Sequence, residues 1–158
     1  MTLLPYTNDC AVKIAGWPST AEETRAWAGA GAHIPLGPVD IGLWHADPDV
    51  HPFVARRGGY LIAYGELWID YSEQEVELGR IIVNPSCRGE GVGRAFVSAL
   101  LERAFTFEFS IVFVRVVPGN TIALRCYRAA GFDVATSDEQ REFNKGQPIQ
   151  YVWLNYRR

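Results

Sequence analysis

The amino-acid sequence predicts an α/β (α+β) fold in which a mixed, mostly antiparallel β-sheet is flanked by helices. The chain has 158 residues, the usual length of one domain, so we expect a single domain over residues 1–158. Its composition, 48% hydrophobic with 5 Trp, 7 Tyr and 8 Phe, supplies a packed core and argues against disorder. The hydrophobic patterns run as three strands joined by tight turns, followed by helices alternating with strands, and this order predicts the mixed sheet.

The first third of the chain predicts helix and loop. Ser19–Glu22 has the form of a capping box, with a hydroxyl at the N-cap and a carboxylate three residues later. We therefore expect a short helix that ends at Gly29, a residue suited to the left-handed conformation of a helix end. Prolines and glycines are dense from Gly29 to Pro52, and they predict loops and short helical turns.

Three consecutive strands are predicted in the middle of the chain. Phe53–Arg56 and Tyr60–Ile69 flank Arg57-Gly58-Gly59, where the glycines permit the positive φ angles of a tight hairpin turn. A third strand, Val76–Val83, ends at Asn84-Pro85 because proline cannot continue the hydrogen-bond ladder. These strands are expected to pair in antiparallel fashion.

The last part of the chain alternates helices and strands. Apolar residues from Val92 to Leu100 recur at helical spacing, so a helix begins inside the glycine-rich stretch that precedes them. Ile111–Val117 is a β-branched run typical of a strand covered on both faces, and we expect it to lie parallel to the preceding strand. The remaining expectations are a short helix from Asn120 to Gly131, a strand starting at Phe132–Thr136, a surface loop over Ser137–Gln147 and a final strand over Ile149–Tyr156.

Charge and cysteine content exclude several classes of function. The formal net charge of −3 gives no basic footprint, so we expect no nucleic-acid partner. No apolar run approaches the ~18 residues of a membrane span, and the first ten residues lack a leader pattern, so we expect no membrane partner and a cytoplasmic location. The three cysteines and three histidines show neither disulfide nor metal-ligand spacing, so no metal is expected.

The most informative segment joins the third strand to the following helix. It reads Arg88-Gly89-Glu90-Gly91-Val92-Gly93. Glycines let the backbone approach a ligand closely, and the unpaired N–H groups of a helix start attract anions, so the segment predicts a pyrophosphate cradle. The side chains of Arg88 and Arg94 can add charge-assisted hydrogen bonds to phosphate oxygens.

Three known kinds of phosphate-binding loop can be compared with this segment. A Walker loop requires a lysine after its last glycine, and the only lysines, Lys13 and Lys145, lie elsewhere. A dinucleotide fingerprint requires G-x-G-x-x-G and an acid at the end of the next strand, whereas this chain has G-x-G-x-G and a strand ending in Val117-Pro118. The R-x-x-G-x-G pattern resembles the acetyl-CoA loop of the GNAT superfamily of N-acetyltransferases. Two further family patterns are present, V-x-P and N-x-x-A-x-x-x-Y-x-x-x-G-F, at Val83–Pro85 and at Asn120, Ala123, Tyr127, Gly131 and Phe132.

This resemblance implies a fold, a cosubstrate and a reaction. The strand before the loop would splay away from its parallel neighbour, and acetyl-CoA would bind along the exposed edge. The main chain of Ile81, Ile82 and Val83 would hold the pantetheine arm, and Asn120 would contact it. The pyrophosphate would be wrapped by Arg88, Gly89, Glu90, Gly91, Val92, Gly93 and Arg94. The reaction implied is transfer of an acetyl group to a primary amine of a small molecule or peptide, by direct attack in a ternary complex.

The resemblance also nominates an acid and a base. Tyr127 would lie beside the thioester sulfur and donate a proton or hydrogen bond to the departing thiolate. In one branch of the family the base stands five residues before the asparagine, but Arg115 occupies that position and cannot accept a proton. In another branch the base lies on the strand before the loop, which corresponds to Glu77. Glu66 or a water relay are the alternatives.

The acids of this region also have a plain interpretation. Glu66–Gly79 carries five acidic residues and no Lys or Arg, which is typical of a solvated hairpin and would also attract a cationic amine. Because Arg115 replaces an acid, the competing hypothesis is a non-catalytic acyl-CoA-binding or regulatory module of the same fold. The apolar segment Tyr151–Leu154 further suggests a homodimer through the last strand. The acceptor is not predicted, because residues 18–54 carry no interpretable motif.

Overall fold

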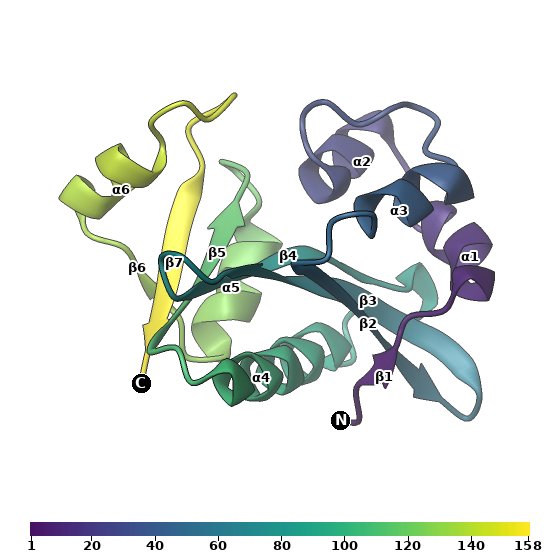
Figure 1. The fold of residues 1–158 in the computed structure, drawn as a ribbon. Helices are drawn as coiled ribbons and strands as arrows, with labels where there is room; N and C mark the ends of the chain where they lie inside the picture. Colours follow the sequence, from purple (N-terminus) through teal and green to yellow (C-terminus); the bar gives the residue numbers. More distant parts are fainter.

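The computed structural model describes all residues from 1 to 158 and is built around a seven-stranded sheet (Figure 1). The strand order is β1-β2-β3-β4-β5-β7-β6, and every neighbouring pair is antiparallel except β4 and β5. This confirms the predicted fold class. The strands are β1 (Leu4–Pro5), β2 (Val50–Arg57), β3 (Tyr60–Asp70), β4 (Glu75–Val83), β5 (Ile111–Val116), β6 (Asp133–Val134) and β7 (Val152–Arg157).

Helices cover both faces of the sheet (Figure 1). They are α1 (Ala11–Ala15), α2 (Ala21–Ala28), α3 (Pro38–Trp44), α4 (Val92–Ala104), α5 (Thr121–Ala129) and α6 (Ser137–Phe143), with short 3₁₀ turns at Asn8–Cys10, Pro85–Cys87 and Phe105–Phe107. The larger core packs α4 and α5 against the sheet around Phe96 and Leu100. A smaller core packs α1–α3 against the opposite face around Ile41 and Tyr64, and α6 covers Phe113 and Trp153 through Phe143. No helix is long and apolar enough to cross a membrane.

The predicted hairpin and parallel pair are both present. Arg57 and Tyr60 close the β2–β3 hairpin, with φ of +55° at Gly58 and +82° at Gly59. β4 and β5 run parallel from the Glu75–Ile111 pair to the Glu77–Phe113 pair and are not paired beyond it. The strands therefore separate from Leu78 onward, which leaves one edge of β4 free within the sheet.

The predicted surface loop over residues 137–147 is wrong, because Ser137–Phe143 forms helix α6. Its start is a capping box in which Thr136 Oγ1 accepts from the Glu139 N–H at 3.3 Å and the Glu139 carboxylate accepts from the Thr136 N–H at 2.8 Å. The polar side chains that suggested a loop bind the backbone of β7 instead. Gln140 donates to the Trp153 carbonyl at 2.8 Å and accepts from the Trp153 N–H at 3.0 Å.

Several element boundaries also differ from the prediction. The cap of α2 is Thr20, which accepts from the Glu23 N–H at 3.0 Å, so the N-cap lies one residue later than expected, and the Glu23 carboxylate accepts from the Ser19 N–H at 2.8 Å. The strand expected from Phe132 is reduced to β6, two residues long, and the last strand begins at Val152. The helix α1 had no signal in the sequence analysis.

The apolar segment of the last strand lies inside the chain. Trp153 and Leu154 are buried because β7 is an interior strand, paired with β5 along its whole length and with β6 near its middle. Their hydrophobic character is therefore accounted for by the core of one chain. The homodimer remains a prediction.

Candidate active site

The glycine-rich loop leaves open space in front of the first turn of α4. Gly89 and Gly91 adopt φ of +81° and +79°, and a Cβ added at either position would meet no atom within 4 Å. Gly91 is the N-cap residue, and the first N–H to bond back into the helix is that of Ala95, at 3.1 Å from the Gly91 carbonyl. The N–H groups of the preceding turn are therefore available to an anion, as a pyrophosphate cradle requires.

The charged side chains of the loop differ in their pairing. Arg88 reaches the Glu23 carboxylate of α2 at 2.5 Å and donates from Nε to the Val83 carbonyl at 3.2 Å. Glu90 is neutralised by Arg57 at the hairpin tip, at 2.7 Å. Arg94 is exposed at the start of α4 and takes part in no ion pair, so its charge is available to a phosphate.

The part of β4 that has no pairing with β5 contains a β-bulge on its other edge, toward β3. The register of the β3–β4 ladder shifts so that Arg80 and Ile81 stand opposite the single residue Gly65. Arg80 has φ of +44°, the only left-handed residue within a strand of this chain, and its carbonyl accepts from Trp27 Nε1 at 2.7 Å. Such strain persists only where the surroundings fix it, and here it lies directly before the predicted pantetheine-binding residues Ile81–Val83.

Helix α5 places the two predicted residues Asn120 and Tyr127. Asn120 caps the helix, because its Oδ1 accepts from the Ala123 N–H at 3.1 Å. Tyr127 is 8% exposed and packs against Phe132, with the ring centroids 6.0 Å apart. Burial, together with the nearby Cys126 and the negative charge of Glu77, raises the pKa of the Tyr127 phenol. The phenol therefore keeps its proton at neutral pH, and it lies within electrostatic reach of Glu77.

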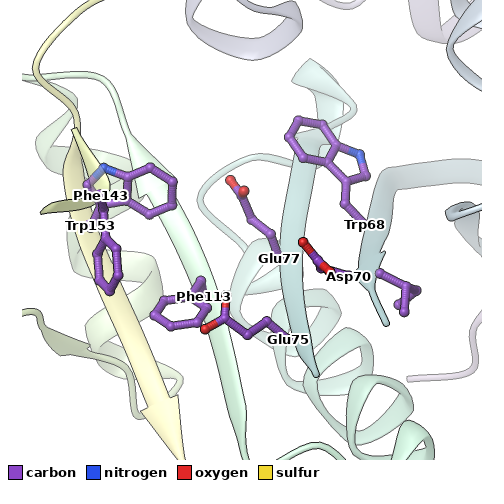
Figure 2. Close-up of a pocket in the computed structure, with 8 residues that line it drawn as sticks. Trp68, Asp70, Glu75, Glu77, Phe113, Phe143 and Trp153 are labelled. Carbon is purple, nitrogen blue, oxygen red and sulfur yellow. The ribbon is translucent and has the colours of Figure 1, made fainter. Parts of the chain in front are cut away.

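Glu77 lines a cavity of about 360 Å³ on the face of the sheet opposite α4. Figure 2 shows Glu77 and Glu75 on β4, between Trp68 on one side and the aromatic rings of Phe113, Phe143 and Trp153 on the other. Ile69 and Asp70 complete the wall. Three carboxylates and four aromatic rings at one opening suit a cationic ligand.

Arg115 holds the Glu77 carboxylate from β5. Its Nε lies 2.5 Å from Oε1 and its Nη2 lies 2.8 Å from Oε2, while Nη1 donates to Gln147 Oε1 at 2.9 Å. Burial raises the pKa of Glu77, and the charges of Arg115 and Arg80 oppose this rise. The side chain of Glu77 remains 17% exposed, so the pair does not seal it from the cavity.

Glu66, the alternative base, has a different environment. Its side chain is fully buried and accepts from the Tyr64 hydroxyl, from Trp68 Nε1 at 2.5 Å and from Arg80 Nη1 at 2.8 Å. His45 Nε2 lies 3.7 Å from it. Burial alone would raise the pKa of Glu66, but the hydrogen bonds and the Arg80 charge outweigh it and lower the pKa. Glu66 is closed off from solvent, whereas the Glu77 side chain is 17% exposed and lines the cavity, so the geometry favours Glu77 as the base.

The lowered pKa of Glu66 predicts an acid-sensitive fold. A carboxyl whose pKa is lower in the folded chain stabilises it above the ordinary value of 4.5, and this stabilisation is lost as pH falls through the folded pKa. We therefore expect the free energy of unfolding, measured with urea from pH 7 to pH 3, to fall more steeply below about pH 4.5 in the wild type than in Glu66→Gln. Equal slopes in the two proteins would contradict this role.

A cradle at a helix start beside a splayed parallel pair is the arrangement that the resemblance to acetyl-CoA-dependent acetyltransferases implies. The model of the Acetyltransferase (GNAT) family matches residues 17–132, and the chain belongs to this family. The enzyme is therefore an acetyltransferase whose cosubstrate is acetyl-CoA. The resemblance inferred from the loop and the α5 pattern is confirmed.

The chain is similar to several named acetyltransferases. It is 26% identical to aminoglycoside N(6')-acetyltransferase type 1 of Klebsiella pneumoniae over 148 residues, which cover 84% of this chain and 74% of that protein. It is 35% identical to N-alpha-acetyltransferase RimI of Mycobacterium tuberculosis over 100 residues, 62% of this chain and 61% of that protein. The structure of AAC(6')-Ib with ribostamycin and coenzyme A matches with a TM-score of 0.77 at 20% identity, covering 99% of this chain and 93% of that chain. This likeness shows the shared fold.

The predicted residues lie on two elements. β4 carries Glu77 and the Ile81–Val83 edge and leads into the loop residues 88–94, while α5 carries Asn120 and Tyr127, and Tyr127 belongs to the core against which Ile81 and Val83 pack. The sequence analysis did not predict the cavity walls Phe143 and Trp153, nor Gln147, which lies in the segment expected to be a loop. No group of three or more His, Cys, Asp or Glu side chains is placed to hold a metal ion.

Proposed function

We propose that the chain transfers an acetyl group from acetyl-CoA to a primary amine of a small molecule or peptide by direct attack in a ternary complex. The observation that carries the proposal is the free edge of β4. One strand presents the glycine cradle at its end, unpaired main chain in its middle and Glu77 where β5 departs. A cosubstrate bound along this edge would have its reactive end near the cavity that Glu77 lines.

The cosubstrate would be held by the groups described above. The cradle would bind the pyrophosphate through main-chain N–H groups and Arg94, the edge from Ile81 to Val83 would bind the pantetheine arm, and Asn120 would contact it through its free amide. Bound acetyl-CoA supplies an acetyl group activated as a thioester. The open space at Gly89 and Gly91, which a Cβ would fill, fits this assignment.

Two side chains of the protein would then transfer protons, one as a base and one as an acid. The reacting amine attacks in its neutral form: its nitrogen lone pair forms the N–C bond to the thioester carbon, and the C–S bond breaks. Glu77 takes the proton lost by the nitrogen, and Tyr127 donates a proton or hydrogen bond to the thiolate that leaves. A carboxylate offers about four lone-pair sites, of which Arg115 uses two, so Glu77 keeps acceptor capacity toward the cavity.

The acceptor class follows from the cavity. Asp70, Glu75 and Glu77 give it negative charge, and its aromatic walls favour a cation. One relative is named as an aminoglycoside N-acetyltransferase and another as an N-alpha-acetyltransferase, so the relatives differ in the amine that they acetylate. A cationic amine is therefore the acceptor class that we propose.

One observation favours the alternative of a non-catalytic acyl-CoA-binding or regulatory module. Both oxygens of Glu77 are bound by Arg115, as they would be in a purely structural ion pair. Such a module would bind acetyl-CoA and release no free coenzyme A with any amine.

Calorimetric titration with acetyl-CoA, coenzyme A and NAD, followed by an amine panel, tests both readings. We expect micromolar binding of both coenzyme A compounds, none of NAD, and release of free thiol with a cationic amine such as an aminoglycoside, spermidine or an N-terminal peptide. Failure of both coenzyme A compounds to bind would overturn the proposal. Binding without turnover across the panel would favour the module.

A further inference from the structure

Arginine and aromatic side chains alternate in a continuous stack across the gap between β4 and β5. The Arg80 guanidinium lies 4.2 Å from the ring of Trp44 and 5.0 Å from that of Trp68. The guanidinium of Arg115 also lies near Trp68, at 5.4 Å, and is itself 4.9 Å from the Trp153 ring. The stack therefore runs from α3 across β4, β3 and β5 to β7, and it holds together strands that the main chain leaves unpaired.

Each arginine of the stack also binds one carboxylate. Arg80 binds the buried Glu66 at 2.8 Å, and Arg115 binds Glu77 through two nitrogens. The two pairs differ in access, because Glu66 is fully buried whereas Glu77 lines the cavity. Of these two carboxylates, only Glu77, which Arg115 binds, is therefore open to a ligand in the cavity.

The Arg115 guanidinium is fixed more completely than an ordinary ion pair requires. Besides Glu77 it binds Gln147, and it stacks on three rings, those of Trp68, Trp153 and Tyr151, the last at 5.5 Å. A planar guanidinium that packs against aromatic rings and is hydrogen-bonded along its edge leaves a bound carboxylate little rotational freedom. The oxygens of Glu77 are thereby fixed in direction.

We propose that Arg115 is a positioning residue for the acetyl transfer: it orients the Glu77 carboxylate at the acceptor cavity so that this carboxylate can take the proton of the amine. The proposal rests on the proposed role of Glu77 as base. Arg115 itself acts only through Glu77. At the position where one branch of the family carries its base, this chain thus has a cation that binds an acid on the neighbouring strand.

The groups around Glu77 determine in which direction its pKa moves when Arg115 is removed. Arg115 on β5 and Arg80 on β4 favour the ionised form, while burial, Glu75 on β4 and Asp70 on β3 oppose it. The Tyr127 phenol on α5 is neutral, and α6 and β7 face the cavity with the uncharged rings of Phe143 and Trp153. Removing Arg115 therefore raises the pKa of Glu77, and the acidic limb of the kcat/KM profile moves to higher pH.

The test compares pH profiles of kcat/KM for an amine that the wild type acetylates. Arg115→Met keeps an apolar chain between the rings but removes the charge, and we expect its acidic limb to lie at least about one pH unit higher than that of the wild type. Arg115→Lys keeps the positive charge but lacks the planar guanidinium. We therefore expect the acidic limb of its kcat/KM profile to stay in place while kcat falls about tenfold. The matched control is Arg103→Met, because Arg103 also stacks on two rings, Phe53 and Phe107, but lies outside the site.

Glu77→Gln separates this proposal from the one on which it rests. If Glu77→Gln keeps full activity, the base assignment fails and the positioning role fails with it. If Glu77→Gln is inactive but Arg115→Met lowers kcat without moving the limb, Arg115 is structural and only the positioning role is overturned. Should Arg115→Met not fold, Arg115→Lys carries the test, since a wild-type kcat there would show that the planar guanidinium orients nothing.

Discussion

Replacing Tyr127 with phenylalanine should lower kcat by about 100-fold or more while leaving the KM for acetyl-CoA nearly unchanged. The hydroxyl is the only group removed, and the ring keeps its contact with Phe132, so the fold and the cradle are preserved. What is lost is the hydrogen-bond donor for the leaving thiolate. A group used only as charge develops affects kcat and kcat/KM alike and leaves binding untouched.

The loss should be the same at every pH at which the wild type keeps the phenol protonated. Burial raises the pKa of Tyr127, so the phenol is a donor throughout the neutral range and the defect should not vary from pH 6 to pH 9. Tyr156→Phe is the matched control, because Tyr156 also packs against Phe132, with ring centroids 5.8 Å apart, but belongs to β7. A Tyr127→Phe variant as active as Tyr156→Phe would remove Tyr127 from the mechanism.

Replacing Gly91 with alanine should raise the KM for acetyl-CoA at least about tenfold. The added Cβ enters the open space before the first turn of α4, where the N–H groups would meet the pyrophosphate. The left-handed backbone at φ of +79° also strains any residue with a Cβ, which lowers the free energy of unfolding by roughly 1–2 kcal/mol. Steady-state kinetics with acetyl-CoA and urea unfolding measure the two effects separately.

Gly58→Ala is the control for that experiment. Gly58 also has a positive φ, +55°, and a Cβ there would also meet nothing within 4 Å, but it lies in the turn of the β2–β3 hairpin. Both variants should lose similar stability, and only Gly91→Ala should lose affinity for acetyl-CoA. Equal KM values in the two variants would show that the loop does not hold the cosubstrate.

The sequence predicted the features that depend on local pattern. Residues close together in the chain determine the conformation of three features: the hairpin glycines, the β-branched run of β5 and the glycine loop. α6 was missed because polar side chains face the sheet: the half-buried Gln140 and the C-cap residue Asn144 hydrogen-bond to Trp153 and Tyr151 at the start of the last strand, a partner that no short window reveals. The Arg115–Glu77 pair joins residues 38 positions apart, so each could be nominated alone but not their contact.

The side-chain amides on α6 also protect the sheet from pairing with another molecule. Beyond the two residues of β6, the outer edge of β7 would expose free N–H and C=O groups that can recruit a foreign strand. Asn144 and Gln140 already occupy these groups at Tyr151 and Trp153, with bonds of 2.8–3.0 Å. A second copy that approached this side would therefore meet a helix surface, and the chain is guarded here against edge-to-edge aggregation.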